Sequence, residues 1–378
     1  MLIAVSVRRS DGWSTEASLD ELAQLATTAG AIVAGRMVQK LESPVKATYL
    51  GSGKLDELAA LKSSSGYDVV IADDELTPLQ QQTLEDRLKV KVIDRVALIL
   101  DIFARRAQTR EGRLQVELAQ YEYNYPRLAG QWRHLERLGA GIGTRGPGET
   151  QLETDRRLIR ERIRRLKTQI EEVRRHRQLY RQRRKRSAIP IAAIVGYTNA
   201  GKSTLFNALT EASVLVEDKL FATLDPTTRR VMLPDKRVIL LTDTVGFIRK
   251  LPPMIVSAFR ATLEELSEAT VLLHVVDLAS HNAAEQNQVV EGTLAQLELA
   301  DKPRITVLNK ADLLVPNARA LDEVAAAAVP GQNVGTAGDT VVVSATRKWG
   351  LDDLLGAIAR RLDEEHVLPT PAPQDDAL

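Results

Sequence analysis

"IAAIVGYTNAGKST", residues 191–204, is the stretch that decides the fold of this chain. A short apolar run ends in Gly196 and leads into Gly201, Lys202 and Ser203, which is the spacing of a phosphate-binding loop between a buried strand and a helix. Main-chain N–H groups of such a loop bind phosphates, the lysine reaches the β- and γ-phosphates, and the serine hydroxyl ligates Mg²⁺. The residues predicted to bind the nucleotide here are Gly196, Asn199, Ala200, Gly201, Lys202, Ser203 and Thr204.

A second motif follows in "VILLTDTVGF", residues 238–247. Asp243 closes the apolar run and is placed to hold Mg²⁺ as a carboxylate at the end of a strand. The main-chain N–H of Gly246 can then sense the γ-phosphate. We therefore expect a metal site that combines Asp243 with the Ser203 hydroxyl.

The third motif, "LNKAD" at residues 308–312, selects the base. The Asp312 carboxylate can accept hydrogen bonds from N1–H and the 2-amino group together, a donor pair that adenine lacks. A main-chain N–H in "VVVSA" would donate to O6 and close the pocket. The residues predicted to bind the guanine base are Asn309, Lys310, Asp312, Ser344 and Ala345.

A similar string, "TYLGSGKLDEL" at residues 48–58, fails the same test. The position five before Gly53 is Thr48, and Lys54 is followed by Leu55, which has no hydroxyl for a metal. This string predicts a tight turn before a helix, although a second nucleotide site in the N-terminal region stays open.

The first ninety residues alternate apolar runs with amphipathic stretches, which predicts a small α/β unit with a parallel sheet. The expected strands are "LIAVSV", "AIVAG", "DVVIAD" and "VKVID". A single long helix is expected over 95–125, ended by Pro126.

Residues 156–186 hold fifteen Arg or Lys and three Glu, whereas the rest of the chain has 36 basic and 47 acidic residues, a net charge of −11. Such a segregated patch favours a polyanion over a merely solvated helix face, and nucleic acid and an anionic membrane both qualify. An apolar heptad seam runs through this stretch, which predicts a helix paired with 95–125 in an antiparallel hairpin, or packed on a domain. Between the two helices, a glycine-rich basic loop carries Trp132.

Composition narrows the classes of function. The chain has 378 residues, 44% hydrophobic and 27% charged, and no cysteine, which excludes disulfides, thiolate zinc sites and cysteine nucleophiles. Its five histidines show no metal-ligand spacing. Because neither a membrane-spanning run nor a secretory leader is present, we expect a cytoplasmic protein. We also expect a monomer.

Five motifs together resemble the HflX-type ribosome-associated GTPases: "LQVELAQYEYNYPRL", "GTRGPGETQLETDRR", "GYTNAGKS", "LFATLDPTTRR" and "DTVGF". The resemblance covers about residues 1–363. It implies GTP-dependent binding to the large ribosomal subunit, dissociation of stalled or idle ribosomes, and entry of the hairpin and loop into ribosomal RNA.

The expected fold is α/β, with a P-loop GTPase domain preceded by a small α/β unit that carries a long antiparallel helical hairpin. The expected domains are an α/β unit at 1–94, the basic hairpin with its loop at 95–186, the GTPase domain at 187–363 and a disordered tail at 364–378.

The resemblance also assigns catalytic roles. It makes Thr223 the switch I ligand of Mg²⁺ and the γ-phosphate, with Thr227 and Thr228 as rivals, and the predicted catalytic set is Lys202, Thr223 and Gly246. Phe247 stands where many GTPases carry a water-orienting Gln, so a low intrinsic rate stimulated by ribosomes is expected. By resemblance to cation-dependent GTPases, Asn199 suggests a K⁺ ion.

Two other functions remain open. One is a regulatory GTPase switch that recruits a protein or makes a peripheral membrane contact, with hydrolysis as a timer. The other is an ATP-driven RNA remodeller, which Asp312 disfavours.

Overall fold

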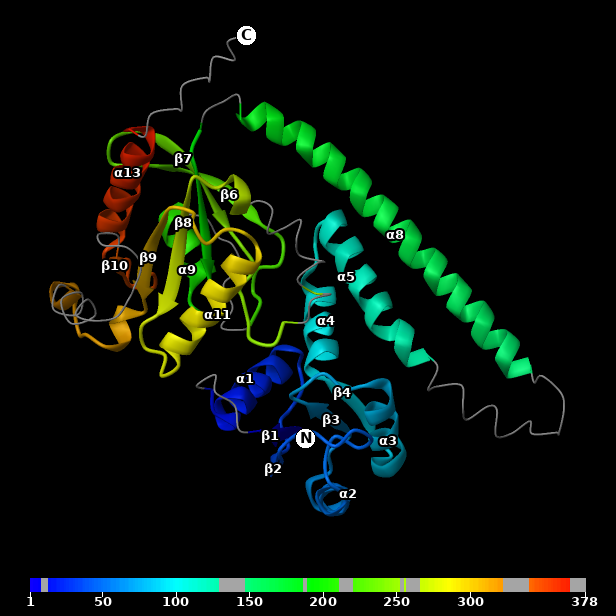
Figure 1. The fold of residues 1–378 in the computed structure, drawn as a ribbon. Helices are drawn as coiled ribbons and strands as arrows, with labels where there is room; N and C mark the ends of the chain where they lie inside the picture. The colour runs from blue at the N-terminus through cyan, green and yellow to red at the C-terminus, as the bar shows by residue number, and fades with distance from the viewer. Residues whose placement is uncertain are drawn as a thin grey trace, which may run out of the picture. The chain divides into compact units, whose positions relative to one another are not determined.

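The computed structural model describes residues 1–7, 13–128, 147–185, 189–210, 220–251, 255, 266–321 and 340–367. The chain forms two compact units, drawn in Figure 1. Unit 1 consists of Met1–Leu179, Lys219–Leu224 and Lys250–Arg260, and unit 2 of Tyr180–Asp218, Asp225–Arg249 and Ala261–Leu378. The predicted loop with Trp132 and the end of the predicted tail, 368–378, lie outside the described residues.

Unit 1 begins with a parallel four-stranded sheet of order β2-β1-β3-β4. Helices α2 and α3 bury one face of it in a common apolar core, and α1 and α4 pack on the strands of the other side. The elements are β1 (Leu2–Ser6), α1 (Thr15–Thr28), β2 (Arg36–Lys40), α2 (Ser52–Ser65), β3 (Val69–Ala72), α3 (Pro78–Leu88), β4 (Lys91–Asp94) and α4 (Arg95–Arg106).

Local sequence sets the helix ends of this sheet domain. Thr77 and Gln80 form a capping box at the start of α3, with Pro78 in the first turn. Gly51 is the N-cap of α2, which confirms the predicted turn before a helix, and Gly66 ends the same helix in the left-handed region.

Two expected elements of unit 1 were wrong. The run "AIVAG", 31–35, is not a strand. The ladder with β1 begins at Leu2 and Arg36, and the run contributes to it only the Gly35 carbonyl, which accepts the Leu2 N–H at 3.0 Å. The single helix expected over 95–125 is two helices, because Thr109 caps a new one by accepting the Gly112 N–H at 3.0 Å. These are α4 and α5 (Arg110–Asn124), the latter followed by η1 (Tyr125–Arg127).

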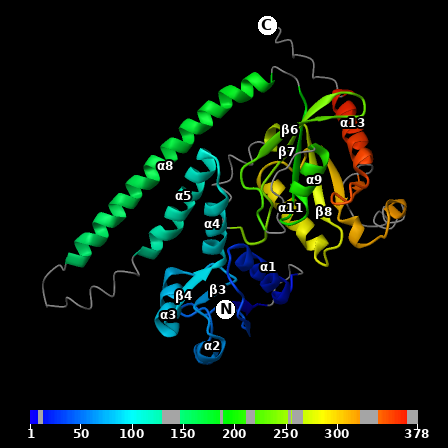
Figure 2. The same ribbon diagram turned by 180° about the vertical axis from the view of Figure 1, so that it is seen from behind.

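Helix α8 (Pro147–Lys185) runs beside α5 in both views of the ribbon (Figures 1 and 2). Arg162 Nε donates to Glu117 at 2.9 Å, and Lys167 pairs with Glu122 at 2.8 Å. Leu166, from the predicted apolar seam, is fully buried. The antiparallel hairpin as a whole stays a prediction.

Unit 2 contains a six-stranded sheet of order β10-β9-β8-β5-β7-β6, parallel except for β6. Helices α9 and α13 share one apolar core with the central strands, and α11 contacts β8. The elements are β5 (Ile191–Gly196), α9 (Lys202–Thr210), β6 (Thr227–Met232), β7 (Val238–Asp243), β8 (Val271–Asp277), α11 (Ala283–Gln296), β9 (Arg304–Asn309), η2 (Ala311–Leu313), η3 (Ala318–Ala320), β10 (Thr340–Val342) and α13 (Leu351–Val367).

Helix α13 continues to Val367, past the expected border between domain and tail at 363/364, and the division into four domains stays a prediction. Among the described residues, none of the helices combines the length and the apolar character needed to cross a bilayer.

His274 on β8 is 2% exposed, and burial lowers its pKa to about 4 despite the opposing effect of Glu291. The folded state therefore favours neutral His274, whereas the unfolded state binds a proton below its pKa of 6.5. The contribution of His274 to the free energy of unfolding is fully present above pH 6.5 and declines as the pH falls toward 4. From pH 7 to pH 5 this group should lower the free energy of unfolding by about 2 kcal/mol.

Urea denaturation at the two pH values checks this. His274→Leu should remove that part of the pH dependence, whereas His281→Gln, at an exposed position, should keep it. Equal pH dependence in the wild type and His274→Leu would contradict the assignment.

Candidate nucleotide-binding site

The phosphate loop follows the buried strand β5 at the centre of the sheet. At Gly196, with φ of +151°, a Cβ would lie 2.3 Å from the Val275 carbonyl oxygen. At Gly201, with φ of +90°, a Cβ would lie 2.3 Å from Asn309 Nδ2. Only glycine fits at both positions, so the loop is held close to β8 and β9.

The Lys202 ammonium lies under the loop. Lys202 as a whole is 6% exposed, and its ammonium donates to the Tyr197 carbonyl at 2.6 Å. Burial lowers its pKa to about 8, with Asp243 acting in the opposite direction and Lys310 adding to the decrease. A buried cation with a lowered pKa gains stability from an anionic phosphate.

Two of the three residues predicted to bind a metal are joined directly. Ser203 Oγ donates to Asp243 Oδ2 at 2.8 Å, and Asp243 is fully buried at the end of β7. Thr223 is buried as well but belongs to unit 1, so its role as a third ligand stays a prediction.

The base-binding motif is tied to the phosphate loop by Asn309. Its Nδ2 donates to the Ala200 carbonyl at 2.9 Å, and its Oδ1 accepts the Ala345 N–H at 3.1 Å. One buried amide therefore fixes three loops that are more than thirty residues apart in sequence.

Lys310 and Asp312 are each held by a neighbour. Lys310, in the left-handed region, places its ammonium 2.8 Å from Asp277. Ser344 Oγ donates to Asp312 Oδ1 at 2.6 Å. The structure thus brings together the predicted phosphate-loop, Asp243 and base-motif residues within unit 2.

The DTVGF segment pairs with the phosphate loop through its main chain. The Thr198 N–H donates to the Phe247 carbonyl at 2.7 Å, and the Phe247 N–H donates to the Gly196 carbonyl at 3.0 Å. A Cβ on Gly246 would lie 2.8 Å from the Lys202 ammonium. Phe247 itself is 2% exposed.

The nucleotide-binding roles of the other loop residues stay predictions. Asn199 is exposed and left-handed, with φ of +62°, whereas Thr204 is partly buried in the first turn of α9. Thr227, one of the rivals of Thr223, begins strand β6.

Sequence reasoning missed Asp277 and Tyr197. Asp277 ends β8, and its position after an apolar strand was the available signal for the partner of Lys310. The Tyr197 hydroxyl accepts the Arg249 N–H at 3.0 Å, and no sequence signal indicates that contact.

Known families match the chain in three parts. They are the GTP-binding GTPase N-terminal family at residues 16–104, the GTP-binding GTPase middle region at 106–184 and the 50S ribosome-binding GTPase family at 191–310. Among solved structures, the crystal structure of the SsGBP and GDP complex matches with a TM-score of 0.50 and 26% identity, over 96% of this chain and 98% of that one.

Curated relatives are closer in sequence. GTPase HflX of Caldanaerobacter subterraneus subsp. tengcongensis is 53% identical over 93% of this chain and 78% of its own length. GTPase HflX of Escherichia coli is 43% identical over 95% and 83%. Fold and site define a P-loop GTPase, which binds guanine nucleotides and hydrolyses GTP to GDP and phosphate. The chain belongs to the HflX family.

Gly196→Ala should lower the free energy of unfolding of unit 2 by about 2–4 kcal/mol, because the new methyl group meets main chain and the φ angle is strained. Binding of fluorescent GDP should fall with it. As a matched control, Gly292→Ala in helix α11 adds a Cβ with nothing within 4 Å and should stabilise the fold by about 0.5–1 kcal/mol. Denaturant titration distinguishes the two, and similar effects would show that the packing argument is wrong.

Proposed function

We propose that this GTPase binds the large ribosomal subunit through the basic helix α8 and the loop before it, and dissociates stalled or idle ribosomes. The observation that supports this most directly is the charge on α8. Arg162 and Lys167 face α5 and pair with its glutamates, whereas Arg165 and Arg175 are 73% and 76% exposed. Arg157 and Arg164 are exposed too.

Packing on α5 therefore uses only part of the positive charge. Arg165 and Arg175 pair with glutamates of α8 itself at 3.9 and 3.8 Å, and such long, exposed pairs can give way to phosphates. The family match at 191–310 is described as a 50S ribosome-binding GTPase, which favours ribosomal RNA over a membrane as the polyanion. Acting on ribosomes, the protein would work in the cytoplasm, and we propose that it does so as a monomer.

For the reaction, we assign Mg²⁺ to Ser203, Asp243 and Thr223, because their hard oxygen atoms are the donors that Mg²⁺ prefers. The bound ion would neutralise charge on the β- and γ-phosphates. Lys202 would leave the Tyr197 carbonyl to contact the same phosphates, and the Gly246 N–H would contact the γ-phosphate.

The side chain of Phe247 cannot orient a water molecule, because it has no polar atom. Since Phe247 is also buried, we propose a low intrinsic rate that ribosome binding increases by ordering the switches. A K⁺ ion at the exposed Asn199 is proposed as an additional positive charge near the phosphates.

Asp312→Asn tests the base assignment. Loss of a carboxylate that accepts from N1–H and the 2-amino group should weaken GDP binding about a hundredfold and shift selectivity toward xanthine nucleotides. Fluorescent-nucleotide titration measures both. Asp353→Asn, at an exposed position in α13, should change neither, and unchanged selectivity in Asp312→Asn would refute the assignment.

Co-sedimentation with purified ribosomal subunits tests the ribosome proposal. With a nonhydrolysable GTP analogue the protein should pellet with large subunits, and with GDP it should bind more weakly. Arg157→Glu with Arg164→Glu should weaken binding and reduce the salt dependence by about one unit of log–log slope for each phosphate that the variant no longer neutralises.

The control carries the same charge change on unit 2. Arg229→Glu with Arg230→Glu, at exposed positions on β6, should leave the salt dependence unchanged. Equal effects of the two pairs would contradict a specific role for α8. Acceleration of GTP hydrolysis by anionic vesicles, without acceleration by large subunits, would favour the regulatory switch instead.

A further inference from the structure

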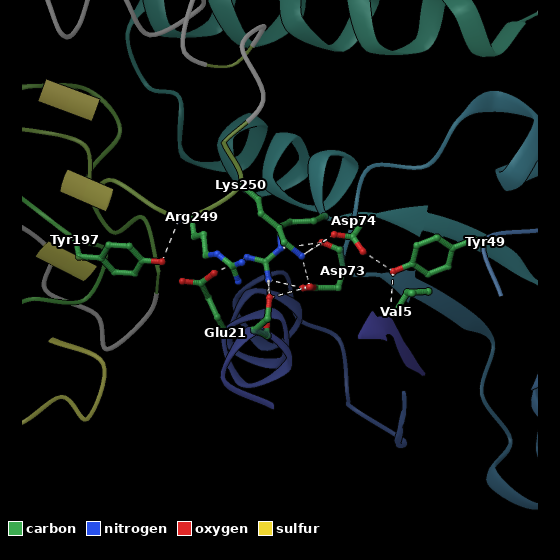
Figure 3. A network of polar contacts seen from close by, with 10 residues as sticks. Val5, Glu21, Tyr49, Asp73, Asp74, Tyr197, Arg249 and Lys250 are labelled. Atoms are coloured by element: carbon green, nitrogen blue, oxygen red, sulfur yellow. Dashed lines mark hydrogen bonds and ion pairs between the residues drawn. The ribbon is translucent and has the colours of Figure 1, made fainter. Parts of the chain in front are cut away.

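Lys250 follows the DTVGF segment by three residues and belongs to unit 1. It adopts the left-handed region, with φ of +56°, and its ammonium contacts two carboxylates at the end of β3. It pairs with Asp73 and lies 2.7 Å from Asp74 Oδ1. Figure 3 shows its side chain directed toward both carboxylates.

The two acceptors are held in place from the other side. Asp73 is 2% exposed, pairs with Arg95 and accepts the Ser18 hydroxyl at 2.8 Å. Although burial opposes it, the charge of Arg95, and after it Lys250, keeps the pKa of Asp73 well below its usual range. Asp74 accepts the Tyr49 hydroxyl at 2.8 Å, as Figure 3 shows.

The position of these carboxylates is also informative. The order β2-β1-β3-β4 reverses direction between β1 and β3, and open parallel sheets bind ligands at the carboxyl ends of strands at such a point. In this sheet the Lys250 side chain, rather than a ligand, contacts the two carboxylates at that end of β3. A lysine 18% exposed against two fixed carboxylates is held more firmly than a surface pair.

The segment that precedes Lys250 is held as well. One residue earlier, the Arg249 N–H donates to the Tyr197 hydroxyl, and Phe247 pairs with the phosphate loop through its main chain. Phe247 and Arg249 are therefore held within unit 2, and Lys250, the next residue along the chain, is held within unit 1. Gly246, next to this stretch, is the residue proposed to contact a γ-phosphate.

We propose that Lys250 is a positioning residue for switch II, the segment that begins with DTVGF. Its ion pairs with Asp73 and Asp74 stabilise the arrangement in which the Phe247 carbonyl accepts a hydrogen bond from the Thr198 N–H. GTP differs from GDP in its γ-phosphate, which the Gly246 N–H has to contact, so GTP requires switch II to rearrange whereas GDP does not. The ion pairs therefore oppose GTP relative to GDP.

A merely structural ion pair would affect both nucleotides equally, so the ratio of the two affinities is the informative quantity. Lys250→Met keeps the aliphatic stem and removes the charge. In the full chain without ribosomes, the affinity for a fluorescent nonhydrolysable GTP analogue, divided by that for fluorescent GDP, should rise at least about fivefold. Lys250→Arg, which keeps the charge, should stay near the wild-type ratio.

Lys236→Met is the matched control. Lys236 is also a left-handed lysine, with φ of +67°, but it is exposed in the turn between β6 and β7. Its substitution should not change the ratio. This test involves no ribosome, so it is independent of the proposed ribosome binding.

The carboxylate side provides a second test that does not depend on how well Lys250→Met folds. Asp74→Asn should raise the same ratio, and the double variant should add little beyond Lys250→Met alone, because Lys250→Met already removes the ion pair with Asp74. A ratio that stays constant or falls in both single variants, or effects that add fully, would overturn the proposal.

Discussion

The buried guanidinium of Arg95 organises unit 1. It is 1% exposed and ion-pairs with Glu21 on α1 and Asp73 at the end of β3. It also donates to the main-chain carbonyls of Ser18 and Asp73. Removing a charge from a buried pair leaves the other uncompensated, at a cost of about 3–5 kcal/mol. Helices α1 and α4 and strand β3 are therefore held together, and Asp73 is held by Arg95 as well as by Lys250.

The same arrangement recurs at the next strand end. Asp94, fully buried, caps α4 by accepting the Ala97 N–H at 2.8 Å and also accepts the Leu76 N–H at 3.0 Å. Arg127, after α5, donates to Asp94 and to the Leu76 carbonyl. The helix that packs beside α8 is thus tied to the sheet. In unit 2, Asn309 at the end of β9 plays the comparable part. In both sheets, polar groups at strand ends connect segments that are distant in sequence.

Short-range patterns predicted much of this. The apolar runs indicated most of the strands, because buried parallel strands read as continuous hydrophobic stretches. The phosphate loop was recognisable because glycines are required there by close contacts. Thr109 was missed as a cap, since the helical period continues across it. The partner of Lys250 was not predictable, because Asp73 lies 177 residues away and no local pattern links them.

Unit 1 combines residues that are synthesised early with Lys250–Arg260, which are synthesised later. Glu21, Asp73 and Arg95 all precede the nucleotide-binding motifs in the sequence, so this triad can assemble while the ribosome is still translating those motifs. Lys250 emerges much later. Until then Asp73 and Asp74 lack that ammonium, and their pairing with it forms only after strands β5, β6 and β7 of unit 2 have been synthesised.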